Sequence, residues 1–312
     1  MMKTEIEAPP GLSENPSEWP EVAIIVLNWN NYEDTAKCLE KLENITYNNY
    51  RVIVVDNGST DNSGERLQND FNWCEFVFNE RNLGFSQGCN TGLKKIQDES
   101  IEYVLFLNND VVVDNSTILN LVNTAEKSEK ISIVGGVISD FNSDHIIFAG
   151  GEICYLTASA SVSNSIPEDE FETGFITGAM ILLPKQYLVD IGGLSEDYFF
   201  GSEDLELCHE TLERGGKLLI NANARARHQH SSTAGHKSAF KYYHFTINRF
   251  VFSSRNSSRI YRYLFYIFFV LSRGVRFIQW IVDGRHDLIW ATIMAVYDYL
   301  KIGKPKRRTD LL

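Results

Sequence analysis

The chain has 312 residues, of which 44% are hydrophobic and 22% are charged, and its formal net charge is −12. This length is enough for a large core, in one big domain or in one domain with an appendage. The charge is uneven: residues 241–312 contain 13 Lys and Arg against 4 Asp and Glu, a balance of +9, which leaves −21 on residues 1–240. The acidic part argues against nucleic acid as a partner, whereas the basic, aromatic tail suits an anionic membrane surface.

The five cysteines are odd in number, scattered and never spaced as CxxC. This pattern favours reduced thiols in the cytoplasm over disulfides or a zinc site. Residues 1–20 are polar, contain several prolines and lack an apolar stretch. We therefore expect a flexible N-terminus that is neither a signal peptide nor a membrane anchor.

Strands and helices alternate through the first part of the chain. Residues 22–27 and 51–55 are short apolar runs typical of buried strands, and 32–42 has apolar residues at helical spacing. This order implies a right-handed crossover and a parallel sheet. Further strands are expected at 75–78, 103–107, 131–134, 175–183 and 218–220, and further helices at 86–96, 115–127 and from 203 onward. The sequence therefore predicts an α/β fold with a Rossmann-like, mostly parallel central sheet flanked by helices.

Polar side chains follow three of these predicted strands. In chain order they are Asn28 and Asn30, then Asp56, then Asn108, Asn109 and Asp110. In an open α/β sheet, ligands bind beyond the carboxyl ends of the strands. A carboxylate such as Asp110 would there hold a hard divalent cation shared with substrate phosphates. The alternative is a strand followed by an Asx-rich turn.

Asp56 is a candidate contact for the ligand. Its carboxylate would accept a hydrogen bond from the imide N–H of a pyrimidine base or from a sugar hydroxyl. For residues 57–61, the favoured interpretation is an Asx turn in which Ser59 or Thr60 caps the next helix.

The segment 82–90 contains two glycines that permit close approach of the backbone, and Ser86 is expected to start the following helix. The chain has no GxGxxG and no GKS/T motif, which argues against a dinucleotide-binding protein and a P-loop NTPase. Residues 139–172 are rich in Ser, Gly and acids, and we expect hairpins and loops that partly cover the site.

A second group of polar residues follows Gly174. Gly178 stands in the predicted strand 175–183, where another group must approach the backbone closely. Ser202 is a predicted N-cap, with Glu203 and Asp204 in the first turn, where the helix dipole favours acids. Stabilising this helix is the alternative role of both acids.

Two histidines, His228 and His230, are two residues apart on an extended segment and would face the same way. The alternative is a pair that is exposed to solvent.

The order of these motifs resembles that of the family two glycosyltransferases, which are inverting enzymes with a GT-A fold, and in particular their rhamnosyltransferase-like branch. The matching segments are VLNWN (26–30), VVDNGSTD (54–61), RNLGF (81–85), LNND (107–110), TGA (177–179), FFGSED (199–204) and His228. They cover about residues 22–235. One departure is that the family's DXD metal motif stands here as Asn108-Asn109-Asp110, with a single carboxylate.

On the donor side, the resemblance implies a pocket for a nucleotide-diphosphate sugar, a dTDP- or UDP-sugar. Its residues would be Asn28, Asn30, Asp56, Asn82, Gly84, Asn108 and Asn109. Asp56 would contact the nucleobase. Asp110 would hold Mg²⁺ or Mn²⁺ bridging the donor diphosphate, and His228 would be a second ligand or a diphosphate contact.

On the acceptor side, the resemblance makes Asp204 the general base and places Glu203, Phe200 and Gly178 beside the acceptor. A helix N-terminus lowers the pKa of Asp204 and weakens it as a base. Burial against Phe199, Phe200 or the acceptor has to act in the opposite direction.

The implied activity is inverting transfer of a sugar, with rhamnose from dTDP-rhamnose as one candidate, to a glycan or lipid-linked glycan in cell-surface polysaccharide synthesis. A non-catalytic nucleotide-sugar binding protein of the same fold is the alternative, and it would not need Asp204. A Rossmann oxidoreductase is disfavoured because the glycine fingerprint is missing. We expect a catalytic domain at 21–239, with a nucleotide-sugar half at 21–114 and an acceptor half at 131–239, and a helical appendage at 240–312.

Residues 260–282 in this appendage are strongly apolar but interrupted by Arg262, Arg273 and Arg276. The uncharged run 263–272 is half of the about 20 residues that a membrane span needs. We therefore expect an interfacial helix whose arginines reach lipid phosphates, on an enzyme peripheral to the inner face of the cytoplasmic membrane. The alternative is a helix that packs on the catalytic domain. A second helix is expected at 287–300, followed by a basic run at 301–308.

Overall fold

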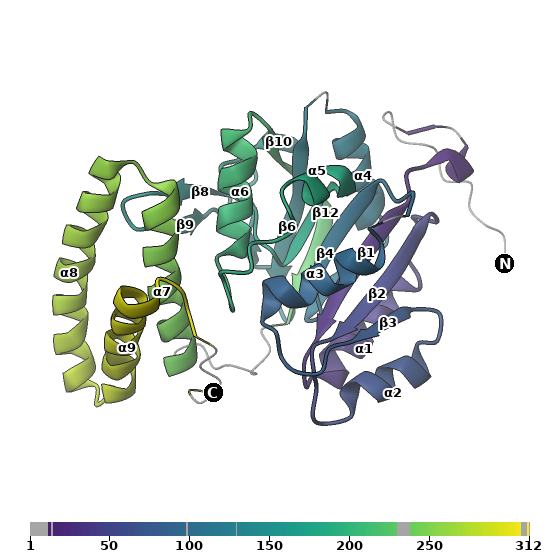
Figure 1. The fold of residues 1–312 in the computed structure, drawn as a ribbon. Coiled ribbons are helices and arrows are strands. Elements are labelled where there is room, and N and C mark those ends of the chain that lie inside the picture. The colour runs from purple at the N-terminus through teal and green to yellow at the C-terminus, as the bar shows by residue number, and fades with distance from the viewer. Residues whose placement is uncertain are drawn as a thin grey trace.

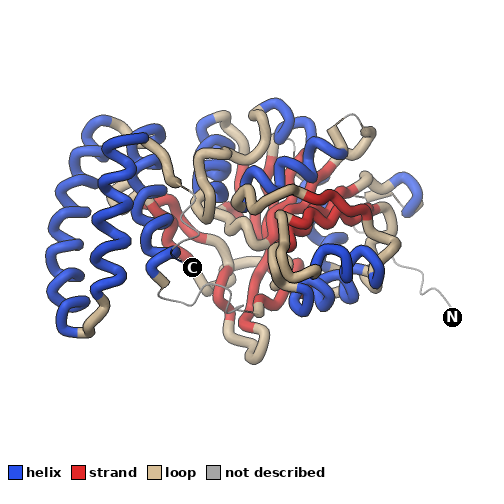
Figure 2. Tube along the Cα trace, turned by 60° about the horizontal axis from the view of Figure 1, so that its bottom comes forward, coloured by secondary structure: helices blue, strands red, loops and turns tan. Residues whose placement is uncertain are grey.

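The computed structural model describes residues 12–13, 15–97, 99–128, 130–229, 238–306 and 311. An α/β body contains most of the chain, and three long helices stand beside it as an appendage (Figure 1). Figure 2 shows the same division from another side, with the strands gathered in the body and the three helices together at one end.

One ten-stranded sheet forms the centre of the body, in the order β10-β12-β6-β11-β4-β1-β2-β3, with β5 paired to β12 and β7 to β6. Its parallel part consists of β1 (Val22–Asn28), β2 (Tyr50–Asp56), β3 (Glu75–Phe78) and β4 (Tyr103–Asn108). Next to β4, β11 (Met180–Pro184) is antiparallel to both β4 and β6 (Ser132–Asp140), and β12 (Lys217–His228) is parallel to β6. The predicted α/β fold with its mostly parallel sheet is confirmed.

Helices cover both faces of this sheet because its central strands are apolar on both sides. α3 (Phe85–Lys95) and α6 (Glu203–Glu213) lie on one face, and α1 (Tyr32–Leu42) and α4 (Thr117–Glu126) on the other (Figure 1). The close packing of α3 depends on Gly92, where an added Cβ would lie 3.0 Å from methyl groups of Ile25 and Val55.

The remaining elements of the body are short. They are η1 (Pro16–Glu18), α2 (Ser63–Asp70), β5 (Val111–Val113), β7 (Ile146–Phe148), β8 (Gly151–Cys154), β9 (Ser159–Val162), β10 (Glu170–Glu172) and α5 (Lys185–Asp190). The predicted hairpin region thus contains β8 and β9, which form a two-stranded sheet. After β8, the ring of Tyr155 lies 5.8 Å from that of His209 on α6 and 6.2 Å from that of Phe252 in the appendage.

Several predicted boundaries differ from the structure. α2 begins at Ser63 with Asn62 at its N-cap, so the predicted cap by Ser59 or Thr60 is wrong. The start of α3 at Ser86 is also wrong, because Gly84 occupies the N-cap position with φ 86°. β11 begins only at Met180, so Gly178 precedes the strand.

β12 is one long strand where the sequence indicates a strand at 218–220 and a separate extended segment. It runs parallel to β6 from Lys217 to His228, with a register shift between Asn221 and Arg225. This length carries the chain from the far end of the sheet to the edge where β1, β2 and β4 finish.

The appendage consists of α7 (Ala239–Asn256), α8 (Arg259–Val282) and α9 (His286–Ile302). α8 and α9 correspond to the predicted helices at 260–282 and 287–300, whereas α7 has no counterpart among the predicted elements. The side chains of Ser238 and Ser258 cap α7 and α8. Phe252 of α7 and Phe265 of α8 belong to the same buried cluster as the sheet, so the core continues into the appendage.

Close packing at the N-terminal side begins within the predicted flexible segment. Trp19 is 2% exposed, and its ring stacks on that of Tyr47 with centroids 5.3 Å apart. Its indole N–H donates to the Ser13 carbonyl at 2.8 Å. Residues 1–11 lie outside the described part. All five cysteines are free.

Candidate active site

The ends of β1, β2 and β4 are joined by a relay of buried polar side chains. The Asn28 amide donates to Asp56 Oδ2 at 2.9 Å and accepts from the Thr35 hydroxyl at 2.9 Å. The Asn109 amide donates to the same Thr35 oxygen at 2.8 Å. Three predicted donor-site residues are thereby brought together, with Thr35 of α1 as a link that the sequence analysis missed. A polar residue on the buried face of an amphipathic helix was the only signal for it.

The carboxylate of Asp56 is fixed on two sides. Its Oδ1 accepts from the Ser59 backbone N–H at 2.9 Å, and a Cβ added at Gly64 would lie 2.6 Å from its Oδ2. Asn30, with φ 50°, accepts from the Thr60 backbone N–H at 2.7 Å. The loop after β2 is therefore held against the end of β1.

Asn57 connects this loop to the segment before α3. Its side-chain oxygen accepts from the Leu83 backbone N–H at 3.1 Å, and its amide donates to Asn82 Oδ1 at 3.1 Å and to the Gly84 carbonyl at 3.0 Å. The predicted role of Asn57 in a local Asx turn is thus replaced by a bridge to residues about 25 positions away. Asn82 and Gly84 are thus tied to the residue that follows Asp56.

Asp110 and His228 meet at the end of β4. β5 pairs with β12 so that Val111 lies opposite His228, and this pairing leaves His228 Nε2 3.4 Å from Asp110 Oδ1. The side chain of His228 is 18% exposed and that of Asp110 is 13% exposed. Lys241 of α7 is also close enough to feel the charge of Asp110. Burial lowers the pKa of Lys241, and the charge of Asp110 raises it in part. His230 lies outside the described residues.

The pair fits part of a divalent cation site. Among the described residues, no group of three or more His, Cys, Asp or Glu is arranged to hold a metal. Mg²⁺ and ions like it are held by one or two protein groups, with the remaining positions filled by water and substrate phosphates. One carboxylate and one imidazole at the mouth of a sheet edge are consistent with that arrangement.

Asp204 lies at the start of α6, beside the same sheet edge. Its Oδ2 accepts from the Gly178 backbone N–H at 3.0 Å, and its Oδ1 from the Leu205 N–H at 2.8 Å. The next residue, Ala179, accepts from the Asn108 N–H at 3.0 Å. Burial raises the pKa of Asp204, and the two N–H donors lower it in part. Burial therefore outweighs the helix N-terminus.

Glu203 is still more buried than Asp204. Burial, and then the charge of Asp204, raises its pKa to about 8, and its Oε2 has no hydrogen-bond partner within the described residues. Both acids border a cavity of about 10 Å³, room for about one water molecule, whose other walls include Phe85 and Leu207. Of the two acids, Glu203 favours the protonated form at neutral pH, because it is buried beside the charge of Asp204.

The loop before these acids is held by α7. The Asn248 amide donates to the carbonyls of Phe200 at 3.0 Å and Gly201 at 2.7 Å. The ring of Phe200 lies 5.3 Å from that of Phe240, and Phe199 stacks on His244 at 5.3 Å. α7 lies within the predicted helical appendage, but no separate helix was predicted over its residues, and Asn248 was therefore missed.

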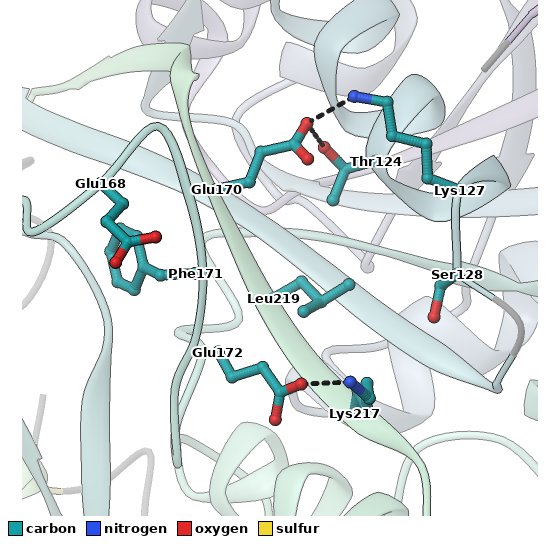
Figure 3. Close-up of a pocket in the computed structure, with 9 residues that line it drawn as sticks. All are labelled: Thr124, Lys127, Ser128, Glu168, Glu170, Phe171, Glu172, Lys217 and Leu219. Atoms are coloured by element: carbon teal, nitrogen blue, oxygen red, sulfur yellow. Dashed lines mark hydrogen bonds and ion pairs between the residues drawn. The ribbon is translucent and has the colours of Figure 1, made fainter. Parts of the chain in front are cut away.

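A larger hollow, of about 470 Å³, lies where α4, β10 and the start of β12 meet (Figure 3). Two of its carboxylates are paired with cations, Glu170 with Lys127 at 3.1 Å and Glu172 with Lys217. Lys217 is the first residue of β12 and His228 the last, so the hollow is roughly 30 Å from the Asp110 edge at the usual rise of a strand. It is at the wrong end of the sheet for the predicted chemistry.

Known structures with the same fold are GT-A glycosyltransferases. GalNAc-T7, solved with UDP, GalNAc and Mn²⁺, superposes with a TM-score of 0.60 at 15% identity, covering 71% of this chain and 45% of that one. The mannosyltransferase PcManGT from Pyrobaculum calidifontis, solved with GDP-Man and Mn²⁺, gives 0.58 at 15% identity, covering 93% and 78%. These identities support a shared fold and no more.

The sequence match identifies the family. Residues 23–190, more than half of the chain, match Glycosyl transferase family 2, and the chain belongs to this family, as predicted. It is 23% identical over 303 residues to the low-salt glycan biosynthesis hexosyltransferase Agl10 of Haloferax volcanii, covering 92% of this chain and 94% of that protein. It is 26% identical over 179 residues to the poly-beta-1,6-N-acetyl-D-glucosamine synthase of Staphylococcus epidermidis, covering 55% of this chain but only 41% of the synthase. The rhamnosyltransferase-like branch and the inverting stereochemistry stay predictions.

Proposed function

We propose that this protein is a glycosyltransferase that moves a hexose-type sugar from a nucleotide-diphosphate donor to a hydroxyl of a glycan or lipid-linked glycan, with inversion, in cell-surface polysaccharide synthesis. One observation carries the proposal. Asp204 accepts the Gly178 N–H, and the neighbouring Ala179 pairs with Asn108, two residues before Asp110. A raised-pKa carboxylate and a candidate diphosphate site therefore border one sheet edge in a member of this family.

The proposed reaction is a single displacement. The acceptor oxygen forms a bond to the anomeric carbon, the bond from that carbon to the phosphate oxygen breaks, and the nucleoside diphosphate leaves with the electron pair. The acceptor proton passes to Asp204. Burial favours the protonated form of Glu203, whereas the N–H groups of Gly178 and Leu205 stabilise the Asp204 anion, so Asp204 is the proposed base.

The donor nucleotide would lie over the relay between β1 and β2. The Asn28 amide and the Ser59 N–H hold the Asp56 carboxylate, which retains acceptor capacity for a base imide N–H or a sugar hydroxyl. A dTDP- or UDP-sugar is the proposed donor, with dTDP-rhamnose as one candidate. Asn30, Asn82 and Gly84 would shape the same pocket.

Asp110 and His228 would hold Mg²⁺ or Mn²⁺ against the donor diphosphate. Such a cation, when bound, offsets the negative charge that develops on the leaving phosphate oxygen. The protein's own part is to present the two ligands together, which the pairing of β5 with β12 achieves.

Turnover of a donor panel by the purified full chain tests the proposal. The panel comprises dTDP-rhamnose, UDP-sugars and GDP-mannose, with glycan and lipid-linked acceptors and Mn²⁺, and NMR of the product reports the anomeric configuration. We expect turnover of at least one donor with inversion. Asp204→Asn should cut kcat by about a hundredfold or more while donor affinity stays near normal. A chain that binds a donor but transfers to no acceptor, with Asp204→Asn binding equally well, is the non-catalytic binding protein instead.

A further inference from the structure

The outer side of α8 carries a stripe of exposed apolar side chains that recurs every three or four residues. It consists of Ile260, Leu264, Ile267, Leu271, Val275, Ile278 and Val282. On the opposite side of the helix, Phe265, Phe269 and Trp280 are buried. A helix that packs on a soluble protein needs one apolar side, so the second apolar side indicates a further partner.

A groove of about 510 Å³ between α8 and α9 extends this apolar surface. Val270 and Phe277 line it from α8, and Ile293 and Leu300 from α9. Trp290, also on α9, is 64% exposed. We use the name outer face for the stripe, the groove and the exposed apolar residues of α9, which are Trp290, Ile293, Tyr297 and Leu300.

Cations border the outer face. Lys301 Nζ lies 5.7 Å from the ring centre of Tyr297, and Lys304 follows two residues after the end of α9. Asp298 on α9 pairs with Lys306, and among the described residues no ion pair joins an acid to Lys301 or Lys304. Apolar and aromatic side chains next to unpaired cations match the interface of a bilayer that contains anionic lipid.

We infer that the outer face rests on the surface of an anionic lipid bilayer, with α8 lying along the interface. α8 is the one described helix that is long and apolar enough to cross a membrane. Crossing would pull Phe265, Phe269 and Trp280 out of the core and carry the arginines at 273 and 276 into hydrocarbon, which is costly. An interfacial position keeps those contacts and covers the stripe.

The arginines contribute differently from what the sequence suggests. Arg262 donates to the Ser257 carbonyl at 3.4 Å, and Arg273 lies over the rings of Phe269 at 5.4 Å and Trp280 at 5.8 Å. Two of the three arginines expected to reach lipid phosphates are thus directed at the protein. The attraction to anionic lipid falls instead to Lys301 and Lys304, together with the excess positive charge of the tail.

The consequence for the acceptor rests on the proposed function. α7 lies between the outer face and the candidate active site. Tyr243 and Ile247 of α7 pack with Ala291 and Ala295 of α9, and Asn248 holds the loop before Glu203. A bilayer on the outer face would therefore be one helix layer from that loop, and the proposed lipid-linked acceptor would reach the site from the membrane.

Sedimentation of the full chain with vesicles, without donor or acceptor, tests the inference separately from glycosyl transfer. The probes are phosphatidylcholine vesicles with and without one quarter phosphatidylglycerol, at low and at high salt. The test variant is Ile267→Glu with Leu271→Glu, two side chains that are 59% and 67% exposed. The matched control is Val162→Glu on β9, 57% exposed and outside the outer face. Circular dichroism checks that each variant is folded.

We expect the intact protein to sediment with the anionic vesicles and less so at high salt. The double variant should bind about tenfold more weakly or worse, and Val162→Glu should bind as the intact protein does. Lys301→Glu with Lys304→Glu should weaken binding to the anionic vesicles only. The inference is overturned if the intact protein stays in the supernatant at low salt, or if it is a stable dimer that the double variant converts to monomer, since the outer face is then an interface between two copies.

Discussion

At the scale of single residues, two adjacent carboxylates on one helix turn acquire different properties from their surroundings. Backbone N–H groups from Gly178 and Leu205 stabilise the anion of Asp204, whereas Glu203 has no such donor for its Oε2. Burial raises the pKa of both, and the pKa of Glu203 rises to about 8. Sequence position alone would rank the two acids as equivalent first-turn residues.

Glu203 should make the protein less stable as pH rises. Its pKa is 4.5 when unfolded and about 8 when folded, so between these values the unfolded chain releases a proton that the folded chain keeps. The free energy of unfolding therefore falls as the pH rises from about 4.5 to 8. The loss reaches roughly 3 kcal/mol at pH 7. Glu203→Gln should remove this slope and raise the unfolding free energy at pH 7 by on the order of 1–3 kcal/mol.

Urea unfolding at pH 5, 6, 7 and 8 measures this effect. Glu213→Gln, at the exposed end of the same helix, is the matched control and should keep the slope of the unsubstituted protein. An unchanged slope in Glu203→Gln would mean that Glu203 is ionised in the folded state.

Asp110→Asn should remove the Mn²⁺-dependent part of donor affinity. The amide keeps the size of the side chain but lacks the charge that a hard cation requires. Calorimetric titration of Mn²⁺ and of donor, each with and without the other, measures this without turnover. Asp144→Asn, an exposed acid 3.4 Å from Arg227 on β12, is the control and should bind both as before. Full Mn²⁺ dependence in Asp110→Asn would place the metal elsewhere.

At the scale of elements, α7 stabilises the acceptor side of the site from outside the sheet. Its Asn248 satisfies two carbonyls of the loop that delivers Glu203 and Asp204. A helix of the appendage, and not a helix of the body, holds this loop through these two hydrogen bonds. The precision of the acid pair therefore depends on a segment beyond residue 190, where the family match ends.

Asn248→Ala should lower kcat by about tenfold with little change in the donor KM, because the donor pocket between β1 and β2 is untouched. Two partly buried carbonyls lose their donor, which costs about 1–3 kcal/mol of stability. Asn120→Ala is the control, since its amide likewise donates to the backbone, to one carbonyl, that of Asn223, away from the site. If both variants lose kcat equally, the effect of Asn248 is general destabilisation.

At the scale of the whole molecule, features set by one short segment could be predicted from the sequence, and features set by contacts between distant segments could not. The helix at 32–42 and the strand at 75–78 agree with α1 and β3 to the residue, because apolar periodicity is a property of one short segment. Thr35 and Asn57 were missed because their partners, Asn109 and Leu83, are distant in sequence. α7 was missed because buried polar residues such as Asn248 interrupt its apolar pattern.

The body and the appendage should unfold as one unit. Phe265 of α8 is fully buried, its ring lies 5.2 Å from that of Phe250 on α7, and it belongs to the same core cluster as β1. Phe265→Ala leaves a cavity and should cost about 3–5 kcal/mol. Because the core is continuous, hydrogen exchange should accelerate both in α8 and in β1. Tyr263→Ala, 70% exposed two residues earlier on the same helix, is the control and should leave exchange in β1 unchanged. If Phe265→Ala accelerates exchange in the appendage alone, the helices are a separately folding unit and the tail can be removed without loss of the body.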